Sequence, residues 1–155
     1  MQQSELVFAY GSNMDPAQMR ERCSESDLAW FTAEAKGWEL CFPRYASKHR
    51  KCAVGSVVKK RGHSVWGVVF AVSHRDLKRL DRFEGPGYKR GMIDAVDTQG
   101  HMHPVWTYFA KPDDPPTKEL PSREYLDSYI RGAEYFGLPK EYRDFLRSIQ
   151  TKPEN

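Results

Sequence analysis

The stretch YGSN at residues 10–13 stands between an apolar run and a segment that begins with Asp15-Pro16. A junction between a strand and a helix leaves several backbone N–H groups without partners, and the helix dipole makes the potential there positive. Gly11 permits close approach of the backbone, and Ser12 and Asn13 add side-chain donors. These features suit a carboxylate or an oxyanion. On residue types alone, a plain polar turn stays open as the alternative.

Glu84 is the second candidate, because it stands where a predicted helix ends and is followed by Gly-Pro-Gly at residues 85–87. A carboxylate at a helix C-terminus meets the negative end of the helix dipole, and aromatic walls would remove water from it. Both effects raise the pKa of a carboxyl group, as a general acid/base near neutral pH requires. A solvated glutamate beside a turn is the alternative on local grounds.

Other side chains with chemical potential are less well placed. His101 and His103 have the spacing of two metal ligands, but no third ligand is evident from the sequence, so we expect no metal site. SVVK at residues 56–59 matches an SxxK pattern, but that chemistry needs one helical turn. On a strand, Ser56 and Lys59 point to opposite faces, and we reject this reading.

These candidates must be positioned by a mixture of short strands and helices. The patterning predicts about seven strands, over residues 6–10, 28–33, 38–42, 52–58, 65–72, 88–96 and 103–109. Four helices are expected, over residues 15–23, 74–83 and 122–136 and from Pro139 onwards. Because most strands are neighbours in sequence, the sheet should be largely antiparallel. We therefore expect an α+β fold, a small curved sheet or barrel with helices packed outside.

Composition limits the class of protein. The chain has 155 residues and 39% hydrophobic residues, which predicts one domain over residues 1–155 with a real core. A net charge of +3 is too small to indicate nucleic-acid binding. The sequence shows neither a signal peptide nor an apolar run of roughly 18 residues, so a cytoplasmic protein is expected. Cys23, Cys41 and Cys52 are expected to be free, buried or half-buried thiols.

Several motifs, taken in order, resemble the γ-glutamylcyclotransferase family and its AIG2-like fold. They are FAYGSNM near the N-terminus, then WGVVFAVSHRDLKRLDRFEG, WTYFA and finally GAEYFGLPKEY. The match runs from about residue 6 to residue 149. YGSN alone is modestly specific, but the four motifs in this order are highly specific.

The resemblance implies a small mixed β-barrel with flanking helices and a cavity in the barrel mouth. It implies that Glu84 occupies the position of the family's catalytic acid/base. The substrate-binding residues that it implies are Tyr10, Gly11, Ser12, Asn13 and Met14 on the N-terminal loop, with Tyr108 and Tyr125 lining the pocket.

The reaction implied by the resemblance is an intramolecular cyclisation. The α-amino nitrogen of a γ-glutamyl compound attacks its own γ-carbonyl carbon, and 5-oxoproline and a free amine are released. This lyase or acyltransferase chemistry belongs to glutathione metabolism in the family and needs no metal or organic cofactor. The expected partner is a small γ-glutamyl molecule, with neither nucleic acid nor membrane involved; monomer and homodimer both stay open.

The leaving group stays open from the sequence: an amino acid, Cys-Gly, or another amine. Arg44, Lys48, Arg50 and Lys89 could favour an acidic leaving portion. One alternative function is a non-catalytic small-molecule binding module on the same fold. Another is a nucleic-acid-binding domain that uses the basic clusters, which steeply salt-dependent oligonucleotide affinity would reveal.

Overall fold

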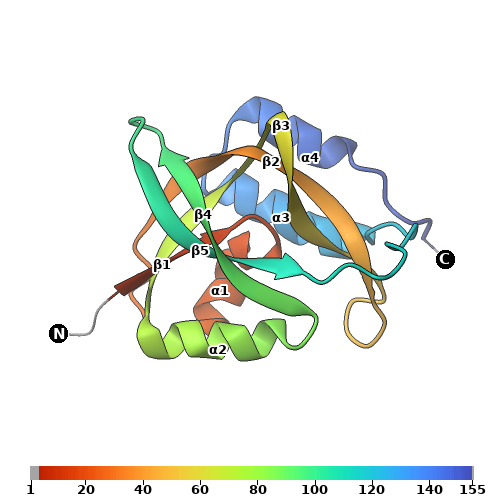
Figure 1. Cartoon of the computed structure of the whole chain (residues 1–155), viewed down its shortest axis with the longest axis horizontal. Coiled ribbons are helices and arrows are strands. Elements are labelled where there is room, and N and C mark those ends of the chain that lie inside the picture. Colours follow the sequence, from red (N-terminus) through yellow and green to blue (C-terminus); the bar gives the residue numbers. More distant parts are fainter. Residues whose placement is uncertain (1–3, 155) are drawn as a thin grey trace.

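The computed structural model describes residues 4–154, which form a small β-barrel surrounded by helices (Figure 1). In chain order the elements are β1 (Ser4–Ala9), the 3-10 turn η1 (Ser12–Met14), α1 (Pro16–Arg22), β2 (Trp30–Ala46), β3 (Cys52–Ser73), α2 (His74–Glu84), β4 (Tyr88–Asp97), β5 (Met102–Ala110), α3 (Arg123–Tyr135) and α4 (Lys140–Ser148).

The barrel is closed, with the strands in the order β1-β3-β2-β4-β5. β1 pairs antiparallel with β3 and, through the register pair Val7 and Trp106, parallel with β5. The pairs of β2 with β3, β2 with β4 and β4 with β5 are all antiparallel. The barrel is therefore mixed, and the strand that leads into the YGSN loop is paired on both of its sides.

The expectation of about seven strands is wrong, because residues 4–154 contain five strands. Two long strands, β2 and β3, each contain two of the predicted short ones. Gly37 and Gly62 lie in the gaps between the predicted short strands. Both have positive φ, 84° and 85°, a conformation that glycine adopts readily. In the structure, the register of β2 against β3 shifts between Lys36 and Trp38, so the ribbon bends and continues.

The predicted helices are present, and side-chain caps account for where three of them begin. Asp15 accepts a hydrogen bond from the Ala17 N–H at the start of α1, and Ser122 accepts one from the Tyr125 N–H at the start of α3. Figure 1 shows α2 along one side of the barrel, with α3 and α4 side by side on another. In α2, Leu77 and Leu80 are buried against the barrel side, whereas Phe83 is 53% exposed.

The start of α2 is fixed by a buried carboxylate. Ser73 caps the helix by accepting from the Asp76 N–H, at 3.0 Å. The Asp76 side chain does not return to the cap; its Oδ2 accepts from the Glu25 N–H at 3.1 Å and from the Ser26 hydroxyl at 2.5 Å. Because Asp76 is fully buried, these bonds tie the helix to the segment that follows α1. Glu84, at the other end of α2, is thus carried by a helix anchored at its N-terminus.

No helix among residues 4–154 combines the length and the apolar character needed to cross a bilayer.

Candidate active site

A hollow of about 350 Å³, counted to its open mouth, lies at one end of the barrel. It receives residues from the end of β1 and the loop after it, from β3 and β5, from the end of α2, from the start of β4 and from α3. Its lining residues are Phe8, Ala9, Tyr10, Gly11, Ser12, Asn13, Gly55, Glu84, Tyr88, Thr107, Tyr108, Tyr125 and Tyr129. The structure thus brings together seven of the eight residues that the sequence proposed for the site.

The loop after β1 turns sharply beside this hollow. The Met14 N–H donates to the Gly11 carbonyl and the Asp15 N–H to the Ser12 carbonyl, both at 3.0 Å. A Cβ at Gly11 would lie 3.0 Å from the Tyr129 hydroxyl, so the close approach of this backbone to α3 favours glycine. Met14 is fully buried in the core beneath the loop and does not line the hollow.

Glu84 contacts the same loop from the opposite side of the hollow. The Asn13 amide Nδ2 donates to Glu84 Oε1 at 3.0 Å. The Glu84 residue is half-buried, since part of it reaches the mouth, but its carboxyl group is surrounded by protein. Burial raises the pKa of Glu84, while Arg22, the Asn13 amide and Arg50 act in the opposite direction and only partly offset it.

Three tyrosines, Tyr88, Tyr125 and Tyr129, gather around Gly55 and form what we call the tyrosine cluster. The Gly55 N–H donates to the Tyr125 hydroxyl and the Tyr88 hydroxyl donates to the Gly55 carbonyl, both at 2.9 Å. The Tyr125 and Tyr129 hydroxyls are 2.7 Å apart. Burial raises the pKa of all three phenols, which therefore stay protonated and can donate hydrogen bonds at neutral pH.

Tyr10 and Tyr108 form the wall between the loop and α2. The Tyr10 hydroxyl donates to the Tyr108 carbonyl at 2.5 Å, and the Tyr108 hydroxyl donates to Asp81 Oδ1 at 2.6 Å. Asp81 also pairs with Arg90 at 2.9 Å. Both predicted tyrosines thus line the hollow with their hydroxyls engaged in the protein, so they shape the wall and fix α2 against β5.

The sequence interpretation missed several residues of this site. Tyr129 could have been found, because it follows a predicted pocket tyrosine by four residues and must share its helix face. The others carry no local signal in the sequence: Gln18, Arg22, Gly55 and Tyr88.

The discounted candidates do not line the hollow. His101 and His103 both approach Asp97 in the β4–β5 turn, with His103 Nε2 at 2.8 Å from Asp97 Oδ2. Within residues 4–154, no group of three or more potential ligands is placed to hold a metal ion. Ser56 is buried and accepts from the Ala110 N–H, whereas Lys59 is exposed, which agrees with the rejection of the SxxK pattern.

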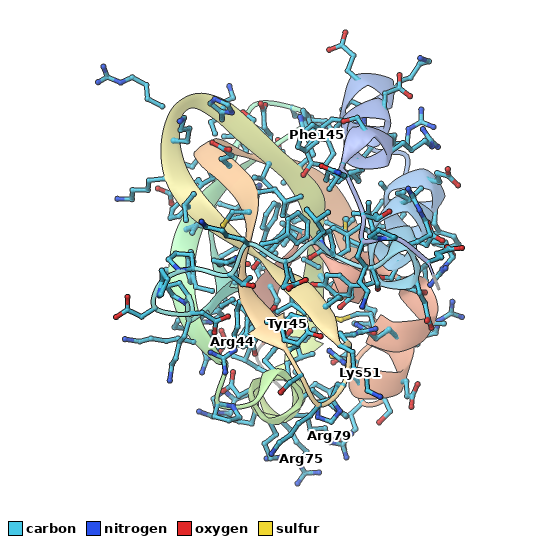
Figure 2. The ribbon with its side chains drawn as sticks, turned by 90° about the vertical axis from the view of Figure 1, so that its right-hand side faces the viewer. Arg44, Tyr45, Lys51, Arg75, Arg79 and Phe145 are labelled. Atoms are coloured by element: carbon cyan, nitrogen blue, oxygen red, sulfur yellow. The ribbon has the colours of Figure 1, made fainter. Side chains whose placement is uncertain are left out.

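Two arginines, Arg44 of β2 and Arg50 of the turn after it, lie beside residues in or next to the lining of the hollow, and we call them the basic rim. Arg50 lies with its guanidinium carbon 5.2 Å from the Tyr125 ring centre and donates to Gln18 Oε1 at 3.1 Å. Arg44 packs against Gly87 and donates to the Lys111 carbonyl at 3.3 Å. Figure 2 shows Arg44 and Tyr45 at the end of β2, near Lys51 of the following turn. The site therefore joins a proton-accepting carboxyl group, a glycine-containing turn and protonated phenols under a basic rim.

Comparison with known proteins shows the family of the chain. Residues 7–127 match the family described as gamma-glutamyl cyclotransferase, AIG2-like. A human gamma-glutamylcyclotransferase is 27% identical over 162 residues, which cover 96% of this chain and 80% of the human one. The bovine gamma-glutamylcyclotransferase is 28% identical over 161 residues, with the same coverage of both chains. A solved structure of a gamma-glutamyl cyclotransferase superposes with a TM-score of 0.90 at 24% identity, over 99% of this chain and 92% of the other. The chain belongs to the gamma-glutamyl cyclotransferase, AIG2-like family.

Proposed function

We propose that the protein is a γ-glutamylcyclotransferase that releases 5-oxoproline from a γ-glutamyl amino acid, peptide or amine. The observation that carries the proposal is the placement of Glu84 against the loop of residues 10–13, with 3.0 Å between Glu84 Oε1 and the Asn13 amide. Membership of the family and the names of the human and bovine relatives support the reaction type.

In this proposal the glutamyl head of the substrate occupies the hollow. The N–H groups of residues 11–13 bind its α-carboxylate, or the oxygen that becomes negative at the γ-carbonyl, or share both tasks. The nucleophile and the carbonyl belong to one molecule, so holding the head in a folded conformation supplies much of the rate enhancement. In the tyrosine cluster Tyr88 donates to Gly55 and one of Tyr125 and Tyr129 donates to the other, so one phenol keeps a proton that it can donate to the substrate.

Glu84 moves the proton. Its carboxylate takes a proton from the substrate α-ammonium group, and the freed nitrogen lone pair attacks the γ-carbonyl carbon. A C–N bond closes the five-membered ring, and the C–N bond to the leaving amine then breaks. Glu84 returns that proton to the leaving nitrogen as this bond breaks. The ring nitrogen gives up its second proton, which the released amine takes up to leave as an ammonium ion, so the carboxylate is regenerated and no water is consumed.

A raised pKa of Glu84 suits both halves of this cycle, because the group must accept a proton and then release it. The base form is the ionised one, so kcat/KM should rise with pH as Glu84 ionises. We expect this acid limb to lie above the value of 4.5 ordinary for glutamate.

The test is Glu84→Gln, which keeps the shape and the Asn13 contact but cannot exchange a proton. Release of 5-oxoproline from a panel of γ-glutamyl amino acids, peptides and amines is measured by mass spectrometry, and binding of the same compounds by calorimetry. We expect binding to persist and turnover to fall by about 10²-fold or more, the contribution of general acid–base catalysis. Turnover above about a tenth of wild type would exclude Glu84 as the acid/base.

The same panel separates the enzyme from a non-catalytic binding module on this fold. Wild-type protein that binds γ-glutamyl compounds and releases no 5-oxoproline from any of them would support the binding module. Faster turnover of compounds whose leaving portion is acidic would agree with the basic rim of Arg44 and Arg50.

A further inference from the structure

The Asn13 side chain links α1 to the carboxyl group of Glu84, and its orientation is determined by its neighbours. Nδ2 donates to Glu84 Oε1, while Oδ1 accepts from Arg22 Nη1 and Gln18 Nε2, all at 3.0 Å. An amide group can turn by half a rotation and exchange its oxygen and nitrogen. A guanidinium group only donates, so the turned amide would set its NH₂ group against Arg22. Arg22 therefore selects the orientation in which Asn13 donates to Glu84.

The second donor to Asn13 is oriented in the same way. Gln18 also carries an amide that could turn, but its Oε1 accepts from Arg50 Nη2 at 3.1 Å. Arg50 thus holds the oxygen of Gln18 toward itself and leaves the Gln18 NH₂ group to face Asn13. Two guanidinium groups, one on α1 and one in the turn after β2, therefore determine a directed chain of hydrogen bonds that ends on Glu84.

We propose that Arg22 is a positioning residue of the active site, which holds the Asn13 amide so that its NH₂ group faces Glu84, with Gln18 and Arg50 supporting the same orientation. For its effect on turnover this inference rests on the proposed function, whereas the orientation itself and the ionisation of Glu84 do not depend on the reaction. In the turned amide an oxygen atom would face the carboxylate, which disfavours the ionised form.

The charged and titratable groups around Glu84 come from every element that meets there. Arg22 and Arg50 lower the pKa of Glu84, and burial raises it. The phenols that act on it are Tyr10 from the end of β1, Tyr88 from β4, Tyr108 from β5 and Tyr125 from α3. The pKa of each phenol is raised, chiefly by burial, so these groups stay neutral while Glu84 titrates. The two arginines are therefore the cations that keep Glu84 ionisable.

Arg22 is also reachable from outside the site. Its guanidinium carbon lies 5.0 Å from the ring centre of Phe83, the residue before Glu84. It lines a second hollow, of about 740 Å³ counted to its mouth, together with Glu21, Arg79, Arg82 and Phe83. Figure 2 shows Arg75 and Arg79 extending from α2 away from the barrel. A guanidinium ion supplied in solution can therefore enter the space that a truncated Arg22 would leave.

The experiment measures the Glu84 carboxyl directly. Glutamate side chains are labelled with ¹³C at Cδ, the Glu84 signal is assigned by its loss in Glu84→Gln, and its titration is followed by NMR. For Arg22→Ala we expect the pKa of Glu84 to rise by about one unit, since a nearby opposite charge and a donated hydrogen bond are both lost. The acid limb of kcat/KM should move to higher pH by the same amount. Arg22→Lys, which keeps a cation that only donates, and low concentrations of guanidinium added to Arg22→Ala should each restore part of the shift.

The matched control is Arg20→Ala, which removes an exposed arginine from the same helix and should leave the titration of Glu84 within about 0.2 units of wild type. An unchanged Glu84 titration in folded Arg22→Ala would overturn the inference. If that variant does not fold, Gln18→Met is measured instead; a smaller rise supports the inference and no rise overturns it. Failure of the proposed reaction is recognised separately, because the NMR titration needs no turnover.

Discussion

The contact between Gly55 and Tyr129 gives a quantitative test of the tyrosine cluster. A Cβ added at Gly55 would lie 2.0 Å from the Tyr129 hydroxyl oxygen and 3.2 Å from the ring carbon that bears it. Ordinary contact begins at 3.4 Å, so in Gly55→Ala the hydroxyl has to move by about 1.4 Å. That displacement breaks the 2.7 Å hydrogen bond between Tyr125 and Tyr129.

The cost of Gly55→Ala follows from two opposed effects. Overpacking of a close-packed interior costs about 1–3 kcal/mol. Alanine also restricts the unfolded chain, which stabilises the folded protein by about 0.4–1 kcal/mol. This gain applies because the φ of Gly55 lies outside the left-handed region, so alanine can adopt the same backbone conformation. We therefore expect a net loss of about 1–2 kcal/mol in the free energy of unfolding. Tyr129→Phe removes the hydroxyl and leaves the Tyr125 hydroxyl without this partner, which costs about 1–2 kcal/mol.

The double variant distinguishes this reasoning from a general loss of stability. With the hydroxyl absent, the new methyl group occupies part of the space that it leaves, so Gly55→Ala should cost little in the Tyr129→Phe background. The free energy of unfolding is measured by urea denaturation for wild type, both single variants and the double variant. Tyr142→Phe, in a buried tyrosine of α4 outside the cluster, is the matched control and should combine additively with Gly55→Ala. Additivity within about 0.5 kcal/mol for Gly55 and Tyr129 would refute the reasoning.

Three further predictions concern proton affinity and a buried anchor. A carboxyl group whose pKa is raised in the folded state destabilises that state once it ionises. Glu84→Gln should therefore be more stable than wild type at pH 8, and the difference should narrow as the pH falls toward 4.5. Urea denaturation at several pH values measures this difference. Asp76→Ala should lower the free energy of unfolding by about 2–3 kcal/mol, because the Glu25 N–H and the Ser26 hydroxyl lose their charged, buried acceptor. Asp76→Asn, which keeps one acceptor oxygen, should lower it less; equal losses would contradict the anchor. Burial raises the pKa of the Cys23 thiol to about 12 and that of the Cys41 thiol to about 11. Both thiols should therefore react slowly with a disulfide reagent at pH 8 in the folded protein and quickly in urea. Peptide mapping of the labelled protein checks this.

The features that the sequence predicted well are local ones. Asp15 and Ser73 stand at helix starts, where their side chains cap the next turn, and that interaction spans three residues at most. The YGSN loop and Glu84 were selected for the chemistry of adjacent residues, and the structure brings them together in one hollow. The order of four motifs added the cavity in the barrel mouth and the two pocket tyrosines, which local patterning alone did not indicate.

The features that the sequence did not predict depend on distant contacts. Gly37 and Gly62 lie in the gaps between predicted strands, but the pairing of β2 with β3 on either side of them makes these gaps bends of long strands. Arg22 had no distinguishing neighbour in the sequence, because its importance comes from Asn13 and Phe83, which reach it only after the chain has folded. Such residues are visible once the geometry is known.

The packing of α3 against η1 has a consequence for substrate binding. A Cβ at Gly132 would lie 2.3 Å from the Met14 Cβ and 2.5 Å from its carbonyl oxygen, so the helix backbone rests directly on the turn. The turn is thus confined between a strand paired on both sides and a helix in direct contact. A ligand that meets amides already fixed in this way loses little binding energy to the ordering of the protein.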